Sequence, residues 1–219
     1  MWCIGVVTAQ YRQRMYDLLA PYARPFQRRE PVVCVDEKSK QLLRDTRTPL
    51  PLRPGVPARH DYEYARAGTC NLFVAVEPKG GRRVVEVTDH RAKVDFVAFV
   101  QRLLEQVYPR ARRVHLVLDN LNTHFRVCFE QVLGVSAARR LLRRVAFHYT
   151  PTHASWLNMA EIEIGILDRQ CLARRLPTRP LLAAEVAAWE KRRNAARCGI
   201  AWTFTRQDAD RKMAEHYVA

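Results

Sequence analysis

The stretch Val114-His115-Leu116-Val117-Leu118-Asp119 is a short apolar run that ends on an acid. A run of this length, bounded by polar residues, predicts a buried β-strand. A second run, Val32-Val33-Cys34-Val35, ends in the same way on Asp36. A carboxylate at the end of a buried strand is costly unless a metal ion, an Arg or solvent at the sheet edge compensates it. If the two strands are neighbours, Asp36 and Asp119 form an oxygen-rich pocket of the kind that Mg²⁺ or Mn²⁺ prefers.

The apolar pattern on both sides of these runs predicts further strands and helices. Segments 70–76 and 83–88 flank a turn rich in Pro and Gly, which predicts an antiparallel hairpin. Apolar residues at three- and four-residue steps predict an amphipathic helix over 94–107 that Pro109 ends. The pattern also predicts a loop over 39–67, helices over 124–133, 136–144 and 181–197, a strand over 145–149, a helix starting near 155–158, and a last helix after Thr205-x-x-Asp208.

This order of elements predicts an α/β fold in which a mixed sheet has helices on both faces. The 219 residues are enough for one domain with a core, or for one domain with appendages. Residues 1–30 are interpreted as an N-terminal linker or appendage with a helix near 11–20. The catalytic core is expected over 31–175, and a helical extension packed on that core over 176–219.

The charge balance points to a polyanionic partner. The chain carries 37 Lys and Arg against 22 Asp and Glu, which gives a net charge of +15. Nucleic acid is the first partner that such a surplus indicates, and an anionic membrane surface is the second. No apolar run approaches the ~20 residues that span a bilayer. The six cysteines form no CxxC pair, so we expect reduced, buried thiols in a cytoplasmic protein.

A site for two metal ions needs a third carboxylate, and the predicted helix over 155–163 offers two. Glu161 and Glu163 lie about 200° apart around the helix axis, so they cannot share a face. Asn158 and Glu161 are three residues apart and do share one. The pattern favours Glu161 as the inward acid, whereas Glu163 points outward or pairs with Arg. An apolar side of the helix is marked by Ile162, Ile166 and Leu167.

Three motifs surround the candidate acids. They are Cys34-Val35-Asp36-Glu37-Lys38, Leu118-Asp119-Asn120-Leu121-Asn122-Thr123-His124, and Tyr149-Thr150-Pro151-Thr152-His153-Ala154-Ser155-Trp156-Leu157-Asn158-Met159-Ala160-Glu161. These motifs resemble bacterial transposases of the insertion-sequence six-thirty family, which is related to mariner elements and belongs to the superfamily with a DDE catalytic triad. The resemblance runs from about Pro31 to the C-terminus. It implies a ribonuclease-H-like fold of the integrase/transposase kind, in agreement with the predicted order of elements.

The resemblance implies that Asp36, Asp119 and Glu161 are the catalytic triad and bind two ions of Mg²⁺ or Mn²⁺. Two such ions activate a nucleophile and stabilise the leaving oxygen of an in-line displacement at phosphorus. Water would nick DNA at an element end, and the freed 3′ hydroxyl would attack target DNA. The implied function is therefore DNA cleavage and strand transfer during transposition, by a homo-oligomer in a synaptic complex with DNA.

Five further residues are candidates for positions beside the triad: Asn120, Asn122, His124, His153 and Asn158. The resemblance suggests that His124 and His153 contact phosphate or support the acids. Structural imidazoles that cap loops are the alternative reading. Asn120 and Asn122 are interpreted as loop formers that orient Asp119. Trp156 either stacks on a base or plugs the start of the helix.

Basic clusters are candidate phosphate contacts, whose binding would depend strongly on salt and weakly on DNA sequence. A solvated basic face is the alternative. Positions 139, 140, 143 and 144 are predicted to fall on one helical face. The candidates are Arg139, Arg140, Arg143, Arg144, Arg174, Arg175, Lys191, Arg192 and Arg193.

Relatives usually carry an N-terminal helix-turn-helix region that reads the element ends. About 30 residues precede the first predicted strand here, without a pair of helices of that pattern. We therefore expect the catalytic part alone, from a split or truncated gene, with recognition supplied by a separate chain. The alternatives are a catalytically inactive remnant that only binds DNA and another ribonuclease-H-like nuclease. We expect no membrane partner and a location in the bacterial cytoplasm, associated with the nucleoid.

Overall fold

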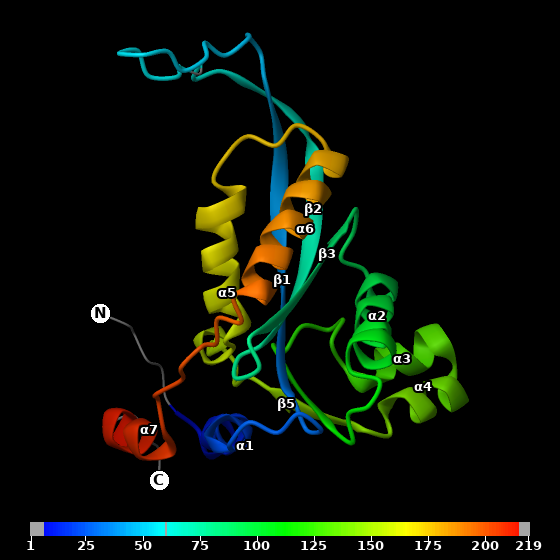
Figure 1. The fold of residues 1–219 in the computed structure, drawn as a ribbon. Coiled ribbons are helices and arrows are strands. Elements are labelled where there is room, and N and C mark those ends of the chain that lie inside the picture. Colours follow the sequence, from blue (N-terminus) through cyan, green and yellow to red (C-terminus); the bar gives the residue numbers. More distant parts are fainter. Residues whose placement is uncertain (1–6, 60, 215–219) are drawn as a thin grey trace.

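The computed structural model describes residues 7–59 and 61–214 (Figure 1). At its centre is a mixed sheet of five strands in the order β3-β2-β1-β4-β5. β1 is antiparallel to β2 and parallel to β4, and helices lie on both faces, as the sequence predicted. The strands are β1 (Val32–Asp45), β2 (Tyr64–Glu77), β3 (Arg82–Thr88), β4 (Val114–Leu118) and β5 (Val145–Tyr149).

β1 and β2 form a long antiparallel hairpin that the sequence did not predict, whereas the hairpin predicted over 70–76 and 83–88 is confirmed between β2 and β3. β1 continues past Asp36 to Asp45, and β2 begins at Tyr64, so the strand end predicted at Asp36 and the loop predicted over 39–67 were wrong. Most residues from 37 to 45 are polar and partly exposed. Backbone hydrogen bonds between β1 and β2 therefore hold this half of the hairpin together. Pairing of this kind leaves no apolar run in the sequence. Residues 46–63 connect the strands at the far end of the hairpin, beyond the body of the molecule (Figure 1).

One face of the sheet carries helices that follow β3 and β4 in the chain. Phe96, Phe99 and Phe129 from these helices pack with Val33 and Val35 of β1 in one buried cluster. The observed helices agree with those predicted over 94–107, 124–133 and 136–144. They are α2 (Lys93–Arg102), continued by the π-helical turn η1 (Leu103–Val107), α3 (Arg126–Leu133) and α4 (Val135–Leu142).

The other face carries the remaining helices. α1 lies on the sheet through Met15 and Leu18, which share a buried cluster with Cys34 and Val117. The segment interpreted as an appendage therefore contains a helix that packs on the strands beside the two candidate Asp residues. These helices are α1 (Ala9–Ala23), α5 (Ala160–Leu167) with the π-helical turn η3 (Asp168–Leu172), α6 (Arg179–Ala195) and α7 (Arg206–Met213).

α7 begins with the predicted capping box. The Thr205 hydroxyl accepts from the Asp208 backbone N–H at 3.1 Å, and the Asp208 carboxylate accepts from the Thr205 N–H at 3.0 Å. Two backbone donors that a helix start leaves without partners are thereby satisfied. The helix then buries Ala209 and Met213 in the cluster that also contains α1.

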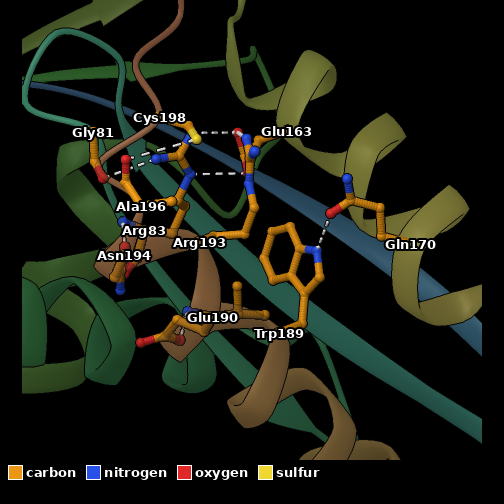
Figure 2. A network of polar contacts seen from close by, with 11 residues as sticks. Gly81, Arg83, Glu163, Gln170, Trp189, Glu190, Arg193, Asn194, Ala196 and Cys198 are labelled. Carbon is orange, nitrogen blue, oxygen red and sulfur yellow. Dashed lines mark hydrogen bonds and ion pairs between the residues drawn. The ribbon is translucent and has the colours of Figure 1, made fainter.

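α6 closes the edge of the sheet along β3 (Figure 2). The Asn194 side chain accepts from the Arg83 backbone N–H at 2.7 Å and donates to the Arg83 carbonyl at 2.9 Å. The Glu190 carboxylate accepts from the Val85 N–H at 2.8 Å. An edge strand with free backbone groups invites pairing with other chains. Side chains of α6 occupy these groups instead, which joins α6 to the sheet.

The described cysteines are free thiols. Four of the five are buried, as expected, and Cys198 is partly exposed; Cys3 lies outside the described residues. The buried thiols are Cys34, Cys70, Cys128 and Cys171. Among the helices within 7–59 and 61–214, none is long and apolar enough to cross a membrane.

Two buried histidines on neighbouring strands link the sheet to α1. His115 Nδ1 lies 2.9 Å from His148 Nε2, and His148 Nδ1 lies 2.9 Å from the Asp17 carboxylate. Arg24 Nη1 lies 3.3 Å from His115 Nε2. Because Arg only donates and an ionised carboxylate only accepts, these hydrogen bonds run from Arg24 through the two imidazoles to Asp17. Burial, His148 and Arg24 together lower the pKa of His115 to about 4.

We expect His115 to destabilise the folded protein as the pH falls from about 6.5 toward 4. In this window the unfolded chain binds a proton on His115, whereas the folded protein does not, so acid favours unfolding. The contribution is fully present above about pH 6.5 and is lost near pH 4. Asp36, whose pKa is raised to about 7, acts in the opposite direction. The measurement is therefore the difference between wild type and His115→Gln in urea unfolding at pH 7 and pH 5.

His115→Gln should lose less stability than wild type between these two pH values. His90→Gln alters an exposed histidine and should retain the wild-type pH dependence. Identical pH dependence in wild type and His115→Gln would contradict the role assigned to His115.

Candidate active site

Asp36 lies on β1 at the point where its pairing with β4 ends. The last paired residues of the two parallel strands are Cys34 and Val117, and Asp36 and Asp119 each follow two residues later. Side chains alternate along a strand, so Asp36 shares the face of Cys34, which packs against the start of α5. The Glu37 backbone N–H donates to the Asp36 carboxylate at 2.8 Å.

The three candidate acids interact electrostatically. Burial is the largest cause that raises the pKa of Asp36 to about 7, and the Glu37 N–H opposes it. The negative charges of Asp119 and Glu161 raise the pKa further, and the charge of His124 lowers it. The negative charges of both other candidate acids therefore act on Asp36. A group of like charges of this kind is stabilised by a cation.

His124 is completely buried between two carboxylates. Its Nδ1 lies 2.5 Å from Asp119 Oδ1, and its Nε2 lies 3.1 Å from Glu37 Oε1. Burial alone would lower the pKa of His124, but hydrogen bonds and charge from Asp119 and Glu37 outweigh burial and raise it to about 9. His124 is thus an imidazolium at neutral pH. It holds the Asp119 side chain, and Phe96 packs on its ring at a centroid distance of 4.3 Å.

Glu37 is a residue of the site that the sequence analysis did not single out. Its side chain is almost fully buried and faces the helices opposite Asp36, because neighbouring residues of a strand point to opposite faces. The signal in the sequence was a second acid directly after the apolar run that ends at Val35. Its partner His124 lies 87 positions away, so no local pattern revealed the contact.

α5 begins later than predicted, which changes the role of Asn158. A short 3₁₀ turn, η2 (Ser155–Leu157), comes first, Asn158 is extended, and the helix starts at Ala160. The prediction that Asn158 and Glu161 share a helix face was therefore wrong. Asn side chains compete with the backbone for hydrogen bonds and favour such helix starts. Buried Asn158 donates to the Val35 carbonyl at 2.9 Å and accepts from the Ala160 N–H at 3.2 Å, which ties α5 to β1 beside Asp36.

Glu161 and Glu163 point in different directions, as the helical spacing required. Glu161 is exposed, so the prediction that it is the inward acid was wrong, although its charge acts on Asp36. Glu163 is completely buried and pairs with Arg83 and Arg193, so the alternative of Arg pairing is confirmed and the outward one is wrong. Ile162 is 41% exposed, so its place on the predicted apolar side was wrong. Leu167 is buried as predicted, Ile166 packs against the same cluster, and Ile164 joins them.

The remaining candidates beside the acids have separate surroundings. Asn120 donates to the Thr150 carbonyl and accepts from Arg14 of α1 at 3.0 Å, so it connects β4, β5 and α1. The Asn122 carbonyl accepts from the Cys128 thiol at 3.2 Å. His153 is exposed in a left-handed backbone conformation with φ of 61°. Trp156 packs edge-on against Phe204 at 5.3 Å, which favours the plug over the base-stacking role.

The nine basic candidates divide into exposed and engaged side chains. Arg144 donates to the carbonyls that end η1, including those of Tyr108 and Ala111, and does not share an open face with its neighbours as predicted. Arg175 binds Asp45, the last residue of β1, at 2.6 Å, and Arg174, which is also exposed, pairs with Glu185. Arg193 binds Glu163. The other exposed members are Arg139, Arg140, Arg143, Lys191 and Arg192.

The donor chemistry suits a hard divalent cation, although the acids do not form a closed cage. Carboxylate oxygens are the ligands that Mg²⁺ and Mn²⁺ prefer. Within the described residues, no group of three or more His, Cys, Asp or Glu side chains is arranged to hold a metal ion. Mg²⁺ commonly uses one or two carboxylates together with waters and substrate phosphates. The residues therefore fit a metal site that the substrate completes.

Comparison with known proteins gives the family and the fold. Residues 31–182 match the family model described as "DDE superfamily endonuclease", and all three acids lie inside the match. Among solved structures, the chain is similar to the one described as the Mos1 mariner paired end complex with Mn, at 16% identity and a TM-score of 0.52. That match covers 99% of this chain and 62% of the other. It confirms the ribonuclease-H-like fold.

The Mos1 Strand Transfer Complex is a second similar structure, at 16% identity and a TM-score of 0.39. This match covers 89% of this chain and 62% of the other. The chain thus spans less than two thirds of the length of these Mos1 chains. No match was found among curated proteins.

Proposed function

The chain belongs to the DDE superfamily endonucleases, and on that premise we propose that it is the catalytic part of a transposase of the bacterial insertion-sequence six-thirty family. Its proposed activity is metal-dependent cleavage of DNA at an element end and transfer of that end into target DNA. One observation supports this proposal most strongly: the parallel pairing of β1 with β4 ends at Cys34 and Val117, two residues before Asp36 and Asp119, so two acids far apart in the sequence lie at the same point of the sheet.

In the proposed reaction, Asp36, Asp119 and Glu161 bind two ions of Mg²⁺ or Mn²⁺. Two bound divalent cations supply Lewis-acid stabilisation of the attacking and leaving oxygens in an in-line displacement at phosphorus. Asp36 must lose its proton to act as a ligand, so its raised pKa of about 7 makes acid compete with binding. His124 holds the Asp119 carboxylate, and Glu37 holds His124 from the other side. These contacts orient the acid before DNA arrives.

Two successive reactions use the same acids. Water first attacks the phosphodiester at the element end and releases a 3′ hydroxyl. This hydroxyl then attacks a phosphodiester of target DNA, and a new DNA–DNA bond replaces the broken one. Neither step needs a covalent bond to the protein.

DNA is the proposed partner, and exposed cations on α4 and α6 are the proposed phosphate contacts. Arg139 and Arg140 lie on α4, Arg143 follows it directly, and Lys191 and Arg192 lie near the end of α6. The net charge of +15 supports strongly salt-dependent binding. We further propose a homo-oligomer in a synaptic complex, a separate chain that carries the helix-turn-helix region, and a location at the nucleoid.

The test is nicking of supercoiled plasmid at low salt by purified protein with Mn²⁺, with Mg²⁺ or with EDTA. We expect nicking with either metal and none with EDTA, because the proposed reaction depends on cations held by the acids. Glu161→Gln removes one charge from an exposed side chain and should abolish the nicking. Metal-independent nicking, or full activity in Glu161→Gln, would overturn the assignment. DNA binding without nicking would favour the inactive remnant, unless a helix-turn-helix chain added in trans restores activity.

A further inference from the structure

α5 is a short helix that packs on the sheet through buried Ala160, Ile164 and Leu167. It has eight residues, the extended residue Asn158 lies two positions before it, and a π-helical turn follows it. Asn158 fixes its start to β1. In addition to this packing, a second polar constraint restrains rotation about the helix axis, which would move the Glu161 side chain away from Asp36.

The second constraint is a buried carboxylate held by two guanidinium groups (Figure 2). Glu163 Oε1 lies 2.9 Å from Arg83 Nε and 3.0 Å from Arg193 Nε. Its Oε2 accepts from Arg83 Nη2 at 2.9 Å and from Arg193 Nη2 at 3.2 Å. Two planar forks on one carboxylate define its position and its direction. The side chains of Glu163 and Arg83 are both 0% exposed.

This arrangement fixes the orientation of Glu161. The two acids are separated by about 200° around the helix, so a Glu163 anchored between Arg83 and Arg193 leaves Glu161 on the open side. Arg83 comes from β3 at the sheet edge, and Arg193 comes from α6. The direction of a candidate metal ligand on α5 thus depends on a residue of α6.

α6 is itself held firmly to the sheet. Asn194, next to Arg193, exchanges two hydrogen bonds with the Arg83 backbone. Val186 and Trp189 lie two turns and one turn before Arg193 on the same side of α6, where they are buried in the cluster that contains Leu167 of α5. Residue 193 lies beyond the region that the family model matches, which ends at residue 182.

We propose that Arg193 is a positioning residue for the cleavage reaction, which acts through Glu163 on Glu161, and that it does not contact DNA. This inference rests on the proposed function. It replaces the expectation that Arg193 binds phosphate, because its guanidinium is 17% exposed and occupied by Glu163. Arg192, one position earlier, is exposed and remains a candidate phosphate contact.

The experiment compares Arg193→Ala with Arg192→Ala in DNA binding at several salt concentrations and in plasmid nicking at saturating DNA. We expect Arg193→Ala to bind DNA within about twofold of wild type and to nick about tenfold more slowly. A higher Mn²⁺ concentration for half-maximal nicking should accompany this loss. Arg192→Ala is expected to bind DNA more weakly, with a shallower dependence on salt.

Two further variants separate positioning from a general loss of stability. Val186→Ala removes buried apolar contact from α6 without touching Glu163, and should nick at the wild-type rate below its unfolding temperature. Arg193→Lys keeps the charge but loses the fork, and should recover part of the rate. It also provides the comparison if Arg193→Ala does not fold.

Each outcome decides the inference. Slow nicking with intact DNA binding in Arg193→Ala or Arg193→Lys, together with normal nicking in Val186→Ala, supports it. A wild-type rate in the Arg193 variants, or weaker DNA binding as the sole defect, overturns it and leaves the proposed function standing. An equal loss of rate in Val186→Ala also overturns it. Absence of nicking in wild type, both alone and with a helix-turn-helix chain added in trans, would overturn the proposed function, and the inference with it.

Discussion

Asp119→Asn is expected to lower the rate of metal-dependent nicking by about 10³-fold or more while low-salt DNA binding stays within twofold of wild type. Loss of a central charge-stabilising group in an enzyme typically costs 10²–10³-fold in rate, and the amide removes one of three charges proposed to hold the cations. Asn still accepts a hydrogen bond from His124, so the fold around the site should persist. Plasmid nicking and a filter-binding assay measure the two properties.

A matched substitution shows whether the effect belongs to the site. Asp89→Asn alters an exposed carboxylate that pairs with Arg179 at 3.1 Å on the surface. Surface pairs of this kind contribute ~0–1 kcal/mol, so this variant should nick and bind like wild type. Nicking by Asp119→Asn at the wild-type rate would remove Asp119 from the triad.

Glu163→Gln should lower the free energy of unfolding by about 3–5 kcal/mol. The change keeps the shape of the side chain but removes the charge that compensates two buried guanidinium groups. Removing one partner of a buried ionic group typically has an effect of this size. The Arg83 and Arg193 forks also hold the pKa of Glu163 below its ordinary value, against the effect of burial, so it stays ionised at neutral pH. Urea unfolding monitored by fluorescence of buried Trp189 measures the change.

Glu161→Gln is the matched control, since it makes the same chemical change two residues away on an exposed side chain. Its free energy of unfolding should lie within about 0.5 kcal/mol of wild type. A triple variant, Arg83→Met, Glu163→Leu and Arg193→Met, should recover much of the lost stability, because apolar side chains can replace a buried ionic group. A loss below about 1 kcal/mol in Glu163→Gln would show that the network contributes little to stability.

The sequence located Asp36 and Asp119 together, although one step of the reasoning was wrong. Asp36 was expected at the end of a strand, yet β1 continues for nine residues beyond it, from Asp36 to Asp45. The prediction of proximity succeeded because the pairing of β1 with β4 ends there. Parallel pairing places corresponding residues of the two strands side by side. This is true whether or not β1 ends at Asp36.

For several side chains, the prediction was wrong because a sequence does not show which distant group a side chain contacts. Arg144 and Arg193 were grouped with exposed neighbours because a sequence records charge and not the partner. Their partners are carbonyls that end η1 and a carboxylate on α5. Asn158 was placed on a helix by spacing alone, whereas its side chain binds the Val35 carbonyl, 123 positions away.

By itself, the sequence determined the strands, most helices and the acids that the proposed function uses, because apolar periodicity and strand ends are local properties. It also required Glu161 and Glu163 to face in different directions, since helical geometry depends only on spacing. Tertiary structure alone decided which of the two is buried, because the Arg partners of Glu163 lie 80 and 30 positions away. Long-range contacts likewise decided that Glu37 and His124 support Asp119, since folding brings separate strands and loops within hydrogen-bonding distance.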